Sequence, residues 1–248
     1  MTKRTSNLRA ACGFTLSLFT ASGLAACGGG DGDNGVTADA NPLDPDAGAG
    51  CATPAAQRLL PLAVGATWTF TVTDGAATET KTSTVQAYED VGATKAGIMA
   101  FRVRTEKIDG STVSWQEDQC DKIVRHREQS FDLGNVMVSE QIYNPQKLRV
   151  DETPDHVTLG ATWIDTYTEV EEDQITGDII TTDKSESWTV DAASESITVP
   201  AGTFDAIKLH RVGTDVGASD KYYWFAPGVG KIKETGTQTE ELSAYDLP

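Results

Sequence analysis

Histidine and cysteine side chains are the groups in this sequence that could most directly supply a base, a nucleophile or a metal ligand near neutral pH. The three histidines are His126, His156 and His210, and no two of them stand at a zinc-ligand spacing. Cys120 precedes His126 closely, but a thiol nucleophile needs a free thiol, a lowered pKa and an oriented base, and the sequence signals none of these. The sequence therefore indicates no catalytic residue, no metal site and no cofactor site.

Carboxylates are the other candidate chemical groups, because a pair of them is enough for glycoside hydrolysis. The chain has 37 Asp and Glu residues, among them the acidic run at 169–173, which reads Glu-Val-Glu-Glu-Asp. Such abundance offers many pairs and identifies none. We interpret the run at 169–173 as a solvated loop or as an edge strand that charge protects against aggregation.

The first 27 residues follow the plan of a bacterial export signal. Lys3, Arg4 and Arg9 make the start positive, and residues 10–26 are mostly apolar or small. That length suits the core of a signal peptide and is short for a membrane span. An ordinary signal peptide cut near Ala26 and an uncleaved anchor helix are the alternatives.

The signal ends in Leu24-Ala25-Ala26-Cys27, which resembles the lipobox of bacterial lipoproteins. The resemblance implies that residues 1–26 are removed by cleavage between Ala26 and Cys27, and that Cys27 carries acyl chains such as palmitate. Two or three acyl chains anchor a protein to a membrane far better than one. Gly28 follows where an inner-membrane retention signal would have Asp, so the same resemblance implies the outer membrane.

Two cysteines remain after this processing, because Cys12 leaves with the signal and Cys27 carries lipid. Cys51 and Cys120 would then lie outside the cytoplasm, where disulfides form and persist. We expect a Cys51–Cys120 disulfide that pins the end of a tether to the folded domain.

Residues 27–51 are expected to be a lipidated, disordered tether, because Gly, Asp, Ala, Asn and Pro dominate them. The whole chain has a formal net charge of −17. Removing residues 1–26, which hold three basic and no acidic residues, leaves 17 basic against 37 acidic residues, or −20. A chain this acidic is repelled by nucleic acid, and nucleic-acid binding is excluded as a function.

Residues 52–248 are expected to form one all-β domain of about ten strands, either an antiparallel sandwich, a half-barrel or a barrel. In the segment 67–73, Trp68, Phe70 and Val72 share one face and threonines share the other. Asp-Gly pairs at 74–75 and 109–110 are typical of hairpin turns.

The domain also shows signs of an internal duplication, with repeats at 60–155 and 156–248. Gly-Ala-Thr-Trp at 65–68 recurs at 160–163, and the segment 96–103 aligns with 201–209 after one inserted residue. Trp115 and Trp224 each stand eight residues before an isoleucine that follows a lysine. Landmarks in the same order favour a diverged tandem repeat, in which the matched tryptophans take equivalent core positions.

The most suggestive feature for binding is the aromatic run Tyr222, Tyr223, Trp224 and Phe225. In a strand, alternate members face opposite ways, so one pair should fill the core and the other could stack on a sugar or an apolar ligand. The run belongs to a Tyr-Trp-Phe-Ala-Pro-Gly-Val-Gly segment that resembles uncharacterised β-domains of bacterial secreted proteins and lipoproteins.

These observations predict a membrane-anchored envelope lipoprotein with a non-enzymatic binding or structural role. An envelope protein, a glycan or an apolar ligand is the expected partner. The alternative is a hydrolase that acts on envelope polysaccharide or peptidoglycan through a carboxylate pair.

Overall fold

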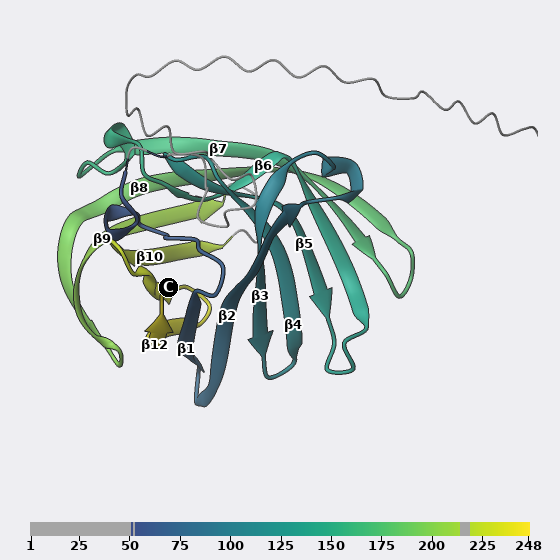
Figure 1. Ribbon diagram of the computed structural model, residues 1–248, viewed down its shortest axis with the longest axis horizontal. Coiled ribbons are helices and arrows are strands. Elements are labelled where there is room, and N and C mark those ends of the chain that lie inside the picture. The colour runs from purple at the N-terminus through teal and green to yellow at the C-terminus, as the bar shows by residue number, and fades with distance from the viewer. Residues whose placement is uncertain (1–50, 52, 214–218) are drawn as a thin grey trace, which may run out of the picture. The chain divides into compact units, whose positions relative to one another are not determined.

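A computed structural model describes residues 51, 53–213 and 219–248, which form a closed antiparallel barrel of twelve strands (Figure 1). The all-β prediction is confirmed, and of the three expected forms the chain adopts the barrel. The export signal, Cys27 and the tether up to residue 50 lie outside the described residues. Within the described ranges, no helix has the length and apolar character needed to cross a bilayer.

The strands follow one another around the barrel in chain order, and β12 closes it by pairing with β1. They are β1 (Thr67–Asp74), β2 (Ala77–Asp90), β3 (Met99–Lys107), β4 (Gly110–Asp118), β5 (Lys122–Phe131), β6 (Met137–Asp151), β7 (Thr162–Asp173), β8 (Ile179–Val199), β9 (Gly202–Gly213), β10 (Asp220–Ala226), β11 (Gly230–Thr235) and β12 (Thr239–Asp246). Three short 3-10 helices, η1 (Ala55–Gln57), η2 (Ala93–Lys95) and η3 (Pro154–His156), lie in the connections.

The expected turns join consecutive strands as hairpins. Asp74 pairs with Ala77 at the end of β1, and Lys107 pairs with Gly110 at the end of β3. Gly75 has a φ of 57°, a conformation that glycine adopts at little cost. The two-residue periodicity in β1 is also confirmed, since Trp68, Phe70 and Val72 are all less than 5 % exposed.

The segment that precedes β1 closes one end of the barrel. Leu59 is buried in one core cluster, and Leu60 and Leu62 pack against both main clusters. Gly228, in the β10–β11 turn, lets this segment pass closely, because a Cβ atom there would lie 2.7 Å from the carbonyl oxygen of Ala56. The glycine of the Pro-Gly-Val-Gly segment is therefore required by the close approach of two backbones.

The acidic run at 169–173 is not where we expected it. It lies within β7, which pairs with β6 on one side and with β8 on the other. Both interpretations of this run, as a loop and as an edge strand, are therefore wrong. A closed barrel has no edge to protect, and these side chains alternate along an interior strand of the ring.

Candidate functional site

The barrel encloses a cavity of about 390 Å³, which is the candidate functional site. At the closed end its lining is apolar and includes Leu60, Leu62 and Trp68. At the opposite end it reaches Lys107 and Asp109, which lie at the exposed β3–β4 turn. A volume of this size falls within the range of small-molecule sites in proteins.

The aromatic run on β10 is divided between the two faces of the barrel wall. Tyr223 and Phe225 are buried and line the cavity. Tyr222 and Trp224 point to the other face. His210 stacks on Tyr222 with ring centroids 4.3 Å apart, and Lys208 lies 4.7 Å from the centroid of the same ring.

Trp224 is unavailable for stacking on a ligand from outside. Its indole is 7 % exposed, and its Nε1 donates to Glu195 at 3.2 Å. Lys233 lies 5.8 Å from its ring centroid on the neighbouring strand. Contacts with other side chains already occupy the rings of Tyr222 and Trp224. Tyr223 and Phe225 are therefore the members of the run that can contact a ligand.

An aromatic row from β7, β8 and β10 leads into the cavity wall. Trp163 and Trp188 stack with centroids 6.0 Å apart, and Trp188 and Tyr223 stack at 5.8 Å. Arg211 lies 5.8 Å from the Trp188 centroid and 5.5 Å from the Tyr223 centroid, while its Nη1 bonds Glu186 at 3.1 Å. Cation–π contacts and the ion pair together fix the guanidinium beside the aromatic wall.

Lysines and glutamates form an ion-pair network on the adjoining part of the wall, from β10 through β11 and β12 to β2. Lys231 on β11 bonds both Glu234 and Glu240, the latter at 2.7 Å. Lys81 on β2 adds a second partner for Glu240, and Lys221 on β10 bonds Glu234 at 2.6 Å. Every carboxylate of this network therefore has two lysine partners.

The network fixes the ionisation of its members. Burial would raise the pKa of Glu240, but attraction to Lys231 and Lys81 outweighs it and lowers this pKa to about 2. The same balance, with Lys231 and Lys221, lowers the pKa of Glu234 well below its usual range. Burial and the nearby charge of Lys231 lower the pKa of Lys81 to about 8.

These shifts predict a loss of stability in acid. A carboxyl whose folded pKa is depressed stabilises the fold above its unfolded pKa, and this contribution disappears as the pH falls towards the folded pKa. For Glu240 the window runs from pH 4.5 down to about 2, and the loss amounts to roughly 3 kcal/mol at 1.36 kcal/mol per pKa unit. Urea unfolding of the protein at pH 6, 4 and 3 should show the decline.

Two other carboxyls affect the stability in the opposite direction. Burial raises the pKa of Glu152 and of Asp165, so their protonation stabilises the fold as the pH falls. A Glu240→Gln variant separates the contributions, because it should show a shallower loss of stability between pH 4.5 and 3 than the wild type. Identical slopes for the two proteins would contradict the assignment.

The three histidines contact different residues and do not form a common site. Each has its own carboxylate: His126 with Glu117, His156 with Asp151 and His210 with Asp220, each pair at 2.8 Å. Among the residues that the structure describes, no group of three or more His, Cys, Asp or Glu side chains could hold a metal ion. Each histidine therefore contacts a carboxylate, and His156 and His210 also stack on an aromatic ring.

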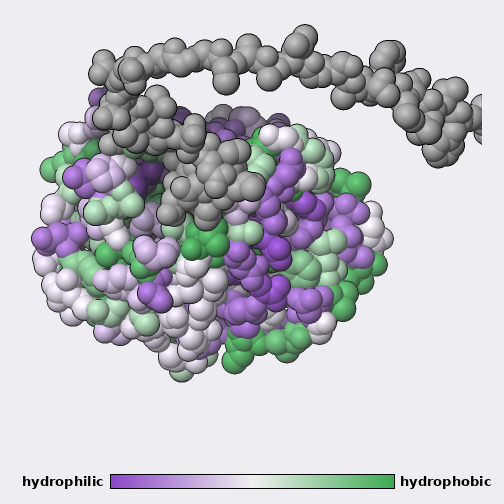
Figure 2. Space-filling view, viewed as in Figure 1, coloured by the Kyte–Doolittle hydropathy of each residue, from purple (hydrophilic) through white to green (hydrophobic). Residues whose placement is uncertain are grey.

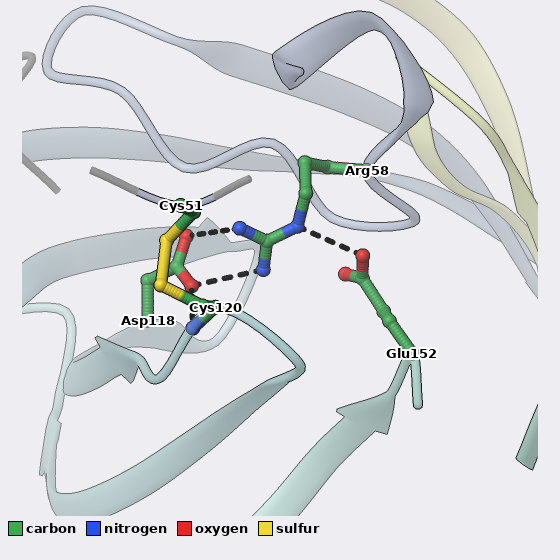
Figure 3. The surroundings of a disulfide bond; sticks show 5 residues. All are labelled: Cys51, Arg58, Asp118, Cys120 and Glu152. Atoms are coloured by element: carbon green, nitrogen blue, oxygen red, sulfur yellow. Dashed lines mark hydrogen bonds and ion pairs between the residues drawn. A yellow bond between two sulfur atoms is a disulfide. The ribbon is translucent and has the colours of Figure 1, made fainter. Parts of the chain in front are cut away.

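The expected disulfide is present between Cys51 and Cys120, with Cα atoms 5.1 Å apart, and the prediction is confirmed (Figure 3). The bond removes the thiol that a Cys120 nucleophile would need. Next to it, Arg58 makes a two-point contact with Asp118 at 2.8 and 2.9 Å and bonds Glu152 at 2.8 Å (Figure 3). The segment that closes the barrel is therefore held by a covalent bond and by a buried ion triad.

Exposed aliphatic side chains gather at the hairpin turns on the side of the cavity mouth. Ile108 in the β3–β4 turn, Leu133 and Val136 in the β5–β6 turn and Ile175 in the β7–β8 turn are 61–79 % exposed. Figure 2 shows hydrophobic residues along the lower and right edges of the molecule, where Figure 1 places these turns. An apolar molecule would meet these side chains beside the entrance.

Sequence reasoning missed the charged cavity wall and the closing segment. Arg211 could have been found, because it continues the inward phase of Ile207 and Leu209 along β9. Arg125 could not, because shifts of register interrupt the pairing of β5 and β6 on both sides of it.

Comparison with known proteins identifies solved structures with limited similarity. No family model matches the chain, and no curated protein matches it. A protein from Bacteroides fragilis, described as exported and of YmcC-like fold, is 12 % identical with a TM-score of 0.46, over 76 % of this chain and 98 % of its own. A protein from Parabacteroides distasonis described as a lipoprotein is 12 % identical with a TM-score of 0.39, over the same shares of the two chains. Similarity at this level is too low to assign a function.

Proposed function

We propose that this protein is a non-enzymatic cell-envelope lipoprotein that binds a small apolar or amphiphilic molecule inside its barrel. The cavity of about 390 Å³ carries the proposal. Its lining joins aromatic and aliphatic side chains at the closed end to charged side chains along the wall, a combination that suits a ligand with an apolar part.

The ionisation states of the carboxyl groups in the cavity favour binding over hydrolysis. A glycosidase of the expected kind needs a carboxyl whose pKa is raised so that it can donate a proton. Glu234 and Glu240 line the cavity, but lysines lower the pKa of both. The carboxyls with a raised pKa, Glu152 and Asp165, are not part of the lining, and Glu152 is paired with Arg58.

Binding can be tested with N-phenyl-1-naphthylamine, an apolar probe that fluoresces when it leaves water. We expect the unlipidated mature chain, from residue 28, to bind about one probe molecule with micromolar affinity. Ser83 lines the cavity on β2, so Ser83→Phe should fill part of the space and weaken binding at least ten-fold.

The matched control is Thr80→Phe on the same strand, where the side chain is exposed outside the cavity. It should bind the probe as the wild type does. If the wild type fails to bind, or if a folded Ser83→Phe protein binds as tightly as Thr80→Phe, the proposal is wrong.

We infer the cellular localisation of the protein from residues 1–28. The signal, the lipobox and Gly28 support lipidation of Cys27 and transfer to the outer membrane. Cells that express the full chain should incorporate radiolabelled palmitate into it, and Cys27→Ala should abolish the label. Label that persists in Cys27→Ala would contradict the proposed anchor.

A further inference from the structure

Four buried N–H donors of cavity-lining residues have no acceptor among the residues that the structure describes. They are the Nε atoms of Arg125, Arg149 and Arg211 and the Nε1 atom of Trp188. Buried polar groups are normally paired in folded proteins, so four unpaired donors around one cavity need an explanation. In the described part of the cavity lining, no buried acceptor is left without a partner.

Arg149 is the most exceptional of the four. Arg125 pairs with Glu128 and Arg211 pairs with Glu186, whereas Arg149 forms no ion pair with any described residue. Burial and the like charge of Arg125 both lower its pKa, yet a guanidinium remains protonated at neutral pH.

The groups that face Arg149 from packed strands do not neutralise it. Glu128 on β5 and Glu234 on β11 attract it, but each of these carboxylates already has its own cation. The hydroxyl of Tyr223 on β10 is neutral, because burial raises its pKa to about 12. Arg149 is partly buried with its Nε enclosed, and a guanidinium in that setting without a counter-charge is costly, so the arrangement calls for an anion.

The balance of charge in the cavity agrees with this requirement. Seven basic and five acidic side chains line it, although the whole chain carries a formal net charge of −17. The acidic outer surface repels anions in general, whereas the cavity wall attracts them locally. The same cavity offers Leu60, Leu62 and Phe225 to an apolar group.

We propose that the cavity binds an amphiphile with a single oxyanion head group, a carboxylate or a phosphate, and that Arg149 is its counter-ion. A planar guanidinium donates two parallel hydrogen bonds to such a head group, and the other unpaired N–H groups of the cavity lining are further donors for its remaining oxygen atoms. This inference rests on the proposed binding function and specifies the class of ligand.

The experiment compares four twelve-carbon probes that differ only in their head group: dodecanoate, dodecyl phosphate, dodecanol and dodecyltrimethylammonium. Each displaces N-phenyl-1-naphthylamine from the unlipidated mature chain, below its micelle-forming concentration. We expect at least one of the two anions to bind ten-fold or more tightly than dodecanol, and the cation to bind more weakly than dodecanol. The ratio between dodecanoate and dodecyl phosphate identifies which oxyanion is preferred.

Arg149→Met tests the residue itself. The variant should lose ten- to one hundred-fold in affinity for the preferred anion, in line with a lost charged hydrogen-bond pair, and less than two-fold for dodecanol. Its thermal midpoint should equal or exceed that of the wild type, because the change removes a partly buried charge that has no counter-ion. Arg149→Lys, which keeps the charge without the planar fork, should fall between the two proteins in anion affinity.

Arg104→Met is the matched control, since Arg104 alternates with the cavity-lining Val103 and Thr105 and so faces outward. It removes one positive charge and should leave all four affinities unchanged. Equal affinities for anion and alcohol in the wild type, or undiminished anion binding by folded Arg149→Met, would overturn the inference while leaving the binding function intact. Failure of every probe would instead contradict the binding function.

Discussion

Replacing Cys51 and Cys120 together by serine is expected to lower the free energy of unfolding by about 4 kcal/mol. The disulfide closes a loop with a sequence separation of 69 residues, so its loss gives the unfolded chain more conformations. The bond also holds the segment that brings Leu60 and Leu62 to the closed end of the cavity.

Urea unfolding of the unlipidated mature chain measures this effect. The control is the wild-type chain reduced with dithiothreitol, which should unfold at the same urea concentration as the double-serine variant. A double-serine variant as stable as the oxidised wild type would show that the disulfide does not stabilise the barrel.

Replacing Arg58 by methionine is expected to lower the free energy of unfolding by about 3–5 kcal/mol. Arg58 is 4 % exposed and lies between two carboxylates, Asp118 and Glu152 (Figure 3). Methionine preserves much of the apolar stem but leaves both carboxylates without their cation. The segment at 55–64 should then leave the end of the barrel more often, although the disulfide still holds it.

Chemical unfolding gives the loss of stability, and limited proteolysis shows whether cleavage begins within 55–64. Arg104→Met serves as the control, because its partner Glu106 is 57 % exposed and loses little when the ion pair is removed. If Arg58→Met and Arg104→Met are equally stable, the buried triad does not hold the segment.

The sequence allowed the class of fold to be predicted because side-chain alternation in strands such as β1 is regular. The turn at 74–75 and the Cys51–Cys120 pair follow from local chemistry and from the inferred compartment, and the structure has both. The charged cavity wall could not be predicted from local sequence patterns alone. Register shifts in β5–β6 change which side chains face inward, and only the closed ring brings Lys81 on β2 to Glu240 on β12.

The positions of the suspected repeats support the proposal that the domain is a duplicate. The matched segments begin β1 and β7, and the matched tryptophans lie on β4 and β10, six strands apart. Trp115 and Trp224 are both 7 % exposed. The Nε1 atom of Trp115 donates to Glu89 at 3.1 Å, and that of Trp224 donates to Glu195 at 3.2 Å.

The basic residue opposite each tryptophan corresponds as well. Arg102 pairs with Trp115 across β3–β4, and Lys208 pairs with Trp224 across β9–β10. The other matched pair of tryptophans corresponds less closely, because Trp68 is 4 % exposed, whereas Trp163 is half-buried beside His156.

The pairing of β1 with β12 has a consequence for the order of folding. Every other pairing in the ring joins strands that are consecutive in the chain, so each can form soon after its two strands are available. Thr67 meets Asp246 only when almost the whole domain is available to fold. Closure is therefore a late event of biogenesis, and a chain that stalls before β12 presents β1 and β11 as templates for intermolecular pairing.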